Sequence, residues 1–153
     1  MCTKRMAALL LGLILLGAGQ AQASPDLGAK NNFILRCTGC HGQDGSGSLA
    51  GGIPDFRGFV ASFSFTPAGR LYLMHVPGVV SASLDNREIA AVMNYVMREW
   101  GGESFNARQY TPFTEQEVAS LQQQEVRDVV KLRREVVRDL QAQGLPVAPY
   151  PWP

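Results

Sequence analysis

Two cysteines three residues apart, followed at once by a histidine, constrain this chain more than any other feature: Cys37-Thr38-Gly39-Cys40-His41. Two thiols at this spacing can form thioether bonds to the two vinyl groups of one haem. The adjacent histidine is then held next to the iron as its axial ligand. The motif therefore predicts one covalently attached haem c, bound by Cys37, Cys40 and His41, inside a small apolar core.

The alternative uses of this motif are a redox-active cysteine pair, a structural disulfide and half of a zinc site. A zinc site needs four ligands, and beyond the N-terminal segment only His75 remains as a further nitrogen or sulfur donor. A thioredoxin-like pair follows a strand in a strand-helix-strand unit, whereas the flanking sequence here indicates helix, glycine-rich loop and helix. Haem attachment is therefore the favoured interpretation.

The first 23 residues have the pattern of a secretory signal peptide. Lys4 and Arg5 form the positive start, residues 6–16 are apolar, and Ala21-Gln22-Ala23 is a small-residue cleavage site. The apolar run is short for a membrane span of about 20 residues, so no permanent membrane span is expected. We expect the mature chain to begin at Ser24 and the protein to be periplasmic, in an oxidising compartment.

The charge balance disfavours nucleic acid as a partner. The whole chain has 14 lysines and arginines against 13 acids, and removal of Lys4 and Arg5 leaves 12, for a net charge of −1. Only Lys30 and Lys131 then remain as lysines, so no lysine-rich docking ring can form. We expect a redox protein as donor or acceptor, docking on an apolar or arginine-containing surface.

The strongest helix signal covers residues 86–100. Asp85 and Glu88 make a capping-box-like pair before it, and Gly101-Gly102 ends it. Its apolar residues recur at helical spacing on one face, which must therefore be buried: Ile89, Val92, Met93, Val96, Met97 and Trp100.

Weaker signals divide the rest of the chain. Thr66-Pro67 is a helix start, and Thr114 with Glu117 begins a charged helical stretch that is either two helices or one bent helix. The expected segments are a helix at 27–37, a helix at 66–75, an apolar turn-rich loop at 76–82, the helical stretch at 114–143 and an extended, proline-rich surface segment at 147–153.

A glycine-rich loop follows the cysteine motif. Five of the eleven residues at 42–52 are glycine, which indicates irregular backbone that wraps a ligand. Pro54 comes directly after this loop, and its carbonyl is a candidate acceptor for the far nitrogen of His41. The alternative is that Pro54 only stiffens the loop.

Together these features resemble a class I cytochrome c domain over about residues 27–100. The matching features are Phe33 four residues before Cys37, the cysteine motif, the glycine loop that reaches Pro54, and the capped helix that carries Tyr95. The resemblance implies an all-α fold in which the first and last helices cross beside the haem. It also implies a one-electron carrier or the small cytochrome partner of a dehydrogenase, rather than an enzyme.

The resemblance divides the mature chain into a haem domain at 24–105 and a helical and proline-rich C-terminal extension at 106–153. In the family, a methionine from the loop before the last helix usually completes the iron. With Tyr95 at the family's aromatic position, that ligand falls near Gly78 or Val79, and neither residue can coordinate iron.

Three candidates remain for the second axial position. Met74 lies four or five residues before the family's ligand position and is the candidate metal ligand in addition to His41. His75 is the other nearby donor. The third possibility is that the position is vacant or holds water. A methionine favours electron carriage, whereas an open iron can bind small ligands. The alternative function is therefore an open-site haem protein that binds or processes a small ligand.

Overall fold

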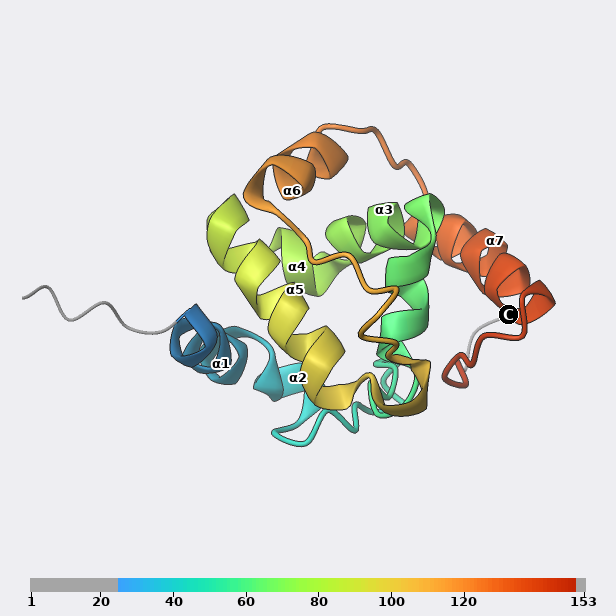
Figure 1. Ribbon diagram of the computed structural model, residues 1–153, viewed down its shortest axis with the longest axis horizontal. Coiled ribbons are helices and arrows are strands. Elements are labelled where there is room, and N and C mark those ends of the chain that lie inside the picture. Colours follow the sequence, from blue (N-terminus) through green and yellow to red (C-terminus); the bar gives the residue numbers. More distant parts are fainter. Residues whose placement is uncertain (1–24, 151–153) are drawn as a thin grey trace, which may run out of the picture.

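The computed structural model describes residues 25–150, and the expected all-α fold is confirmed over that range. The predicted signal peptide lies outside the described residues. Between residues 25 and 150, no helix has the length and hydropathy that a membrane span requires. The elements, shown in Figure 1, are α1 (Pro25–Arg36), α2 (Thr38–His41), the 3₁₀ turn η1 (Val60–Phe65), α3 (Pro67–His75), α4 (Pro77–Val80), α5 (Asn86–Trp100), the 3₁₀ turn η2 (Gly102–Ser104), α6 (Glu115–Gln122) and α7 (Val129–Ala142).

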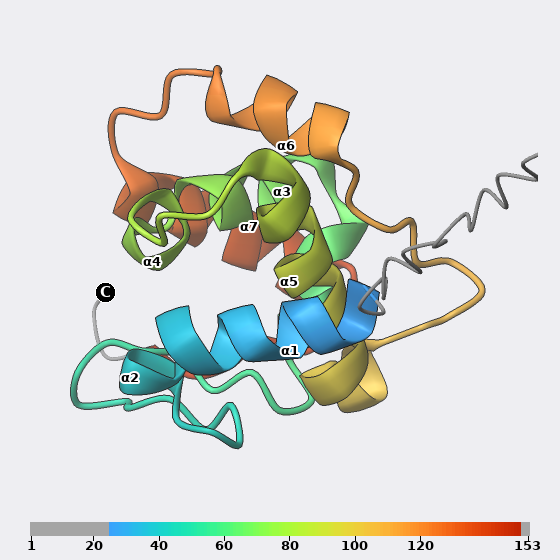
Figure 2. The ribbon, with the colours of Figure 1, turned by 90° about the vertical axis from the view of Figure 1, so that its left-hand side faces the viewer.

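Helices α1 and α5 pack against each other, as the resemblance implies (Figures 1 and 2). Phe33 of α1 is the central contact, with only 1% of its surface exposed. Its ring centroid lies 4.5 Å from that of Trp100 and 6.0 Å from that of Tyr95, both on α5. This aromatic cluster positions α1 on α5, and therefore also positions the cysteine motif that follows α1.

Local sequence signals account for the bounds of α5. The Asp85 carboxylate accepts a hydrogen bond from the backbone N–H of Glu88 at 2.8 Å, and the Glu88 carboxylate accepts one from the backbone N–H of Asp85 at 2.9 Å. The predicted capping box is thus confirmed. The predicted apolar face is buried, apart from Trp100, which is half-buried.

The C-terminal extension forms two helices rather than one bent helix. Helix α6 packs on α3 and α5, and α7 packs on α3 and η1 (Figure 1). Val118, Val136 and Leu140 are at most 1% exposed and belong to the same hydrophobic cluster as Phe33 and the apolar residues of α5. Helices α6 and α7 therefore share one hydrophobic core with α1 and α5.

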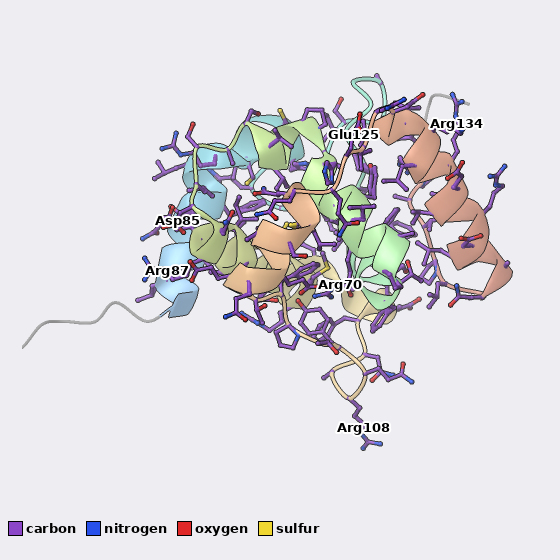
Figure 3. The ribbon with its side chains drawn as sticks, turned by 90° about the horizontal axis from the view of Figure 1, so that it is seen from above. Arg70, Asp85, Arg87, Arg108, Glu125 and Arg134 are labelled. Carbon is purple, nitrogen blue, oxygen red and sulfur yellow. The ribbon has the colours of Figure 1, made fainter. Side chains whose placement is uncertain are left out.

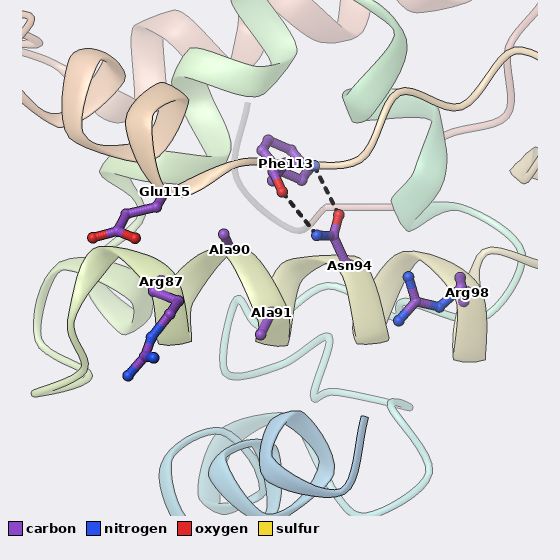
Figure 4. A pocket seen from close by; sticks show the side chains of 7 residues that line it. All are labelled: Arg87, Ala90, Ala91, Asn94, Arg98, Phe113 and Glu115. Carbon is purple, nitrogen blue, oxygen red and sulfur yellow. Dashed lines mark hydrogen bonds between the residues drawn. The ribbon is translucent and has the colours of Figure 1, made fainter. Parts of the chain in front are cut away.

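Asn94 on α5 anchors the start of the extension. Its side-chain amide donates to the carbonyl of Phe113 at 2.9 Å, while its oxygen accepts from the Phe113 N–H at 2.8 Å and from the Tyr110 hydroxyl at 2.6 Å. Figure 4 shows the first two bonds in a groove of about 360 Å³ between α5 and the segment that leads into α6. These bonds hold an irregular segment against a helix without a strand or a disulfide.

Two expected segments differ from the structure. The apolar loop at 76–82 contains one helical turn, α4, that starts at Pro77. The end of the described chain also packs more closely than a surface segment: Ala148 is 6% exposed, Pro146 accepts a 2.6 Å hydrogen bond from the Ser62 hydroxyl, and Tyr150 lies under the Arg133 guanidinium. Tertiary contacts, which local sequence does not encode, hold this segment in place.

Candidate haem site

The two thiols and the imidazole lie on one tight turn at the end of α1. Cys37 precedes α2, while Cys40 and His41 lie within it. The backbone N–H of His41 donates to the Cys37 carbonyl at 3.0 Å, and the Thr38 hydroxyl donates to the Ile34 carbonyl at 2.8 Å. Both cysteines are free thiols, Cys37 half-buried and Cys40 exposed. The turn thus presents two unbonded sulfurs and one ring within five residues.

The environment of Cys37 is unlike that of a reactive thiol. Burial raises the pKa of the Cys37 thiol, and the neighbouring Cys40 raises it further. A redox-active Cys-x-x-Cys pair has at least one thiol with a lowered pKa, because the thiolate is the nucleophile. The raised pKa disfavours Cys37 as the reactive thiol of such a pair.

The His41 ring is packed so that it stays neutral. It stacks on Phe56, with ring centroids 3.9 Å apart and an interplanar angle of 20°. Burial lowers the pKa of His41 to about 4, and neutral imidazole is the form that binds a metal. The nearby Pro54 carbonyl raises the pKa of His41 and so partly offsets the effect of burial. Pro54 therefore lies beside His41. Nδ1 of His41 is buried and has no hydrogen-bond partner within the described part of the chain.

The glycine loop folds back on itself to bring Pro54 to this place. The N–H of Gly47 donates to the His41 carbonyl at 2.9 Å, and Ser48 and Ile53 exchange two backbone hydrogen bonds, each 2.9 Å long. Gly47 has a φ of +65°, and a Cβ there would lie 2.5 Å from the carbonyl oxygens of Ile53 and Pro54. Only glycine meets both requirements.

The variant Gly47→Ala is therefore expected to destabilise the protein more than Gly58→Ala. Gly58 also has a positive φ, +82°, but no atom lies within 4 Å of a Cβ placed there. We expect a loss of about 1–2 kcal/mol in the free energy of unfolding for Gly58→Ala, and about 1–3 kcal/mol more for Gly47→Ala because of the steric overlap. Urea unfolding of both haem-loaded variants measures the difference. Equal losses would contradict the role assigned to the contact with Pro54.

Helix α4 lies opposite α2 at the same end of the molecule (Figures 1 and 2). It contains Gly78 and Val79, the two residues at which the resemblance places the missing methionine. Val79 is half-buried, and Val80 is 64% exposed. This helix therefore contributes hydrocarbon, and no ligating side chain, at the end of the molecule where α2 lies.

The other two candidate ligands are held elsewhere in the fold. Met74 is 0% exposed and belongs to the hydrophobic core. His75 contacts two backbone carbonyls: its Nδ1 lies 2.9 Å from the Leu71 oxygen, and its Nε2 lies 2.9 Å from the Gln124 oxygen. The structure places Cys37, Cys40, His41 and Pro54 close together, whereas the Met74 side chain is fully buried in the core and both nitrogens of His75 contact backbone carbonyls.

Sequence reasoning missed the residues that support the His41 side of the site. Phe56 covers the ring of His41, and Arg57 ties the loop together through a two-bond pair with Asp55, at 3.0 and 2.8 Å, and a longer contact to Asp44 at 3.4 Å. Phe56 and Arg57 closely follow Pro54 in the sequence, and this proximity is the signal that could have identified them. Residues next to a predicted ligand-orienting group are candidates for the same site.

Crossed helices, a Cys-x-x-Cys-His turn beside them and an apolar helix opposite that turn are together the features of a c-type haem protein. Cytochrome c-552 of Thermus thermophilus is 36% identical to this chain over 130 residues, which cover 73% of this chain and 84% of that protein. A second cytochrome c-552 from the same species is 35% identical over 112 residues, covering 61% and 82%. No protein-family model matches the chain.

The chain therefore belongs to the class I cytochrome c family, whose members carry electrons with a single haem. Its cofactor is covalently bound haem c. The residues of the α2 turn fit this group: two free thiols, and a neutral histidine whose buried Nδ1 lacks a partner.

Proposed function

We propose that this protein is a periplasmic one-electron carrier that serves as the small cytochrome partner of a dehydrogenase. The observation that carries the proposal is the asymmetry of the α2 turn, in which Cys37 is half-buried and Cys40 is exposed. A haem attached to both sulfurs has one edge in the core and one edge near the surface. Bound haem c supplies reversible one-electron chemistry at its iron, and an edge near the surface allows transfer without bond chemistry by the protein.

Each site residue has a proposed role in holding the haem. Cys37 and Cys40 would hold the haem through two thioethers, each S–H adding across one vinyl double bond, the sulfur to one carbon and the hydrogen to the other, without a change of oxidation state. His41 would hold the iron through Nε2. The Pro54 carbonyl would accept a hydrogen bond from Nδ1 of His41, which would orient the ring and raise its basicity as a ligand.

Surface composition supports a partner that docks through apolar contacts. Leu35, two residues before Cys37, is 74% exposed, and Val80 on α4 is 64% exposed. Exposed large apolar side chains at the end of the molecule that carries the haem edge are suited to a short-lived encounter. The small net charge of the mature chain gives little electrostatic steering.

The location is tested by expressing the full chain in a host that attaches haem c in its periplasm. The expected product is a coloured periplasmic protein that begins at Ser24, has the mass of that chain plus one haem and undergoes reversible one-electron reduction. A retained leader or a cytoplasmic product would contradict the proposed location, and a colourless product would contradict the haem assignment.

The dehydrogenase partner is tested with the purified ferric protein in periplasmic extract of its own organism. Addition of dehydrogenase substrates such as alcohols, amines or sugars should reduce it at a rate far above that without substrate. Absorbance of the reduced haem follows the reaction. If no substrate increases the rate, the protein is not the electron acceptor of such an enzyme under those conditions, and the partner proposal fails.

A further inference from the structure

We propose that the chain provides no second axial ligand to the haem iron, and that the position opposite His41, beneath the valines of α4, binds small neutral molecules such as carbon monoxide. This inference rests on the proposed attachment of haem at α2. It concerns the same site and identifies a ligand class for it.

The first step is the burial of every methionine among residues 25–150. Met74 and Met97 are 0% exposed and Met93 is 6% exposed. A sulfur that is to coordinate iron must border the space that the haem occupies, as the half-buried His41 ring does. Met74 is covered by protein on all sides, so it cannot reach the iron without leaving the core.

The second step concerns His75, the other nearby donor. Its Nδ1 contacts the Leu71 carbonyl within α3, and its Nε2 contacts the Gln124 carbonyl in the segment between α6 and α7, both at 2.9 Å. Neither nitrogen is available to a metal in this arrangement. Coordination through Nε2 would break the contact that joins α3 to the extension.

The third step is the chemistry of α4. Its four residues, Pro77 to Val80, contribute hydrocarbon and backbone only. The hydroxyl of Ser81, the next residue, donates at 2.6 Å to the Pro77 carbonyl and is therefore already engaged. An apolar cover without a donor favours small uncharged ligands over anions, because a buried anion would lack a hydrogen-bond partner.

The test is carbon monoxide binding by the ferrous haem-loaded protein, together with the ferric absorption spectrum. We expect prompt, stoichiometric carbon monoxide uptake and no charge-transfer band of methionine-ligated ferric haem. The variant Met74→Leu should behave in the same way, since Met74 is a core residue. In contrast, Val79→Met and Val80→Met each place a thioether on α4, and at least one should gain the methionine band and lose carbon monoxide affinity by at least tenfold. Val80→Leu is the control for added bulk and should keep the unaltered behaviour.

Three results would overturn the inference. The unaltered ferrous protein could refuse carbon monoxide, it could show a methionine band that Met74→Leu removes, or it could show a low-spin spectrum that His75→Gln changes. In each case the haem is still attached, so the proposed electron-carrier function survives. A protein without covalent haem would instead overturn the proposed function itself.

Discussion

Serine at both Cys37 and Cys40 is expected to remove all covalently bound haem from the exported protein. Serine has nearly the same size as cysteine but forms no thioether, so the variant loses both bonds to the haem while the α2 turn can keep its backbone hydrogen bonds. Haem staining after denaturing electrophoresis should be strong for the unaltered protein and absent for the double variant. The single variant Cys37→Ser or Cys40→Ser should retain at most one thioether.

A matched control lies between the two cysteines. Thr38→Ser keeps the hydroxyl that donates to the Ile34 carbonyl and should leave haem attachment unchanged. Haem that remains covalently attached in the double cysteine variant would show that another residue holds it. The double variant should also unfold at lower denaturant concentration, because covalently held haem stabilises only the folded chain.

The parts of the fold that the sequence predicted best are those set by local chemistry. The bounds of α5 follow from the Asp85 and Glu88 capping box, an apolar stripe at helical spacing and the glycines after Trp100. The start of α3 follows from Thr66, whose side chain accepts a hydrogen bond from the Gly69 N–H, and from Pro67 in the first turn. Each signal lies within a few residues of its effect.

The parts that the sequence left open depend on contacts between distant residues. The 2.6 Å bond from Ser62 to the Pro146 carbonyl joins residues 84 positions apart, and it helps to hold a segment that by composition alone is an extended tail. Helix α4 has only four residues, too few for an apolar period to appear. Such elements are fixed by what they pack against.

For the candidate site, too, local sequence predicts one part and tertiary packing determines the other. The identity of its chemistry follows from five consecutive residues, since two thiols and an imidazole at this spacing fit one cofactor. The position of Met74 in the fold does not follow from its spacing along the sequence. Its distance along the chain from α5 is close to that of a ligand, but α3, α7 and η1 pack together, and Met74 lies in the common core instead. Tertiary packing decided which sulfur is available.

Replacement of Arg70 by methionine is expected to lower the free energy of unfolding by about 3 kcal/mol. The Arg70 guanidinium forms a two-bond ion pair with Glu117, donates at 3.1 Å to the carbonyls of Ser64 and Thr111, and lies 3.7 Å from the ring centroid of Phe113. The side chain is only 11% exposed. Methionine preserves much of the volume but leaves two carbonyls and a carboxylate without their donor.

Arg108 provides the matched control, because it is an exposed arginine on the loop before α6. Figure 3 shows its side chain extending away from the molecule, whereas Arg70 lies near the centre of the view. Arg108→Met should change the free energy of unfolding by no more than about 0.5 kcal/mol.

Chemical denaturation of Arg70→Met, Glu117→Gln and the double variant completes a thermodynamic cycle. Because the two side chains bond directly, the double variant should lose less than the sum of the single losses, with a coupling of at least about 1 kcal/mol. Glu117 lies on α6 and Arg70 on α3, so this coupling measures how strongly the C-terminal extension is joined to the haem domain. Additive losses would mean that this ion pair does not help to hold the extension, which would then depend on apolar packing, through residues such as Val118 and Leu140, and on the Asn94 hydrogen bonds.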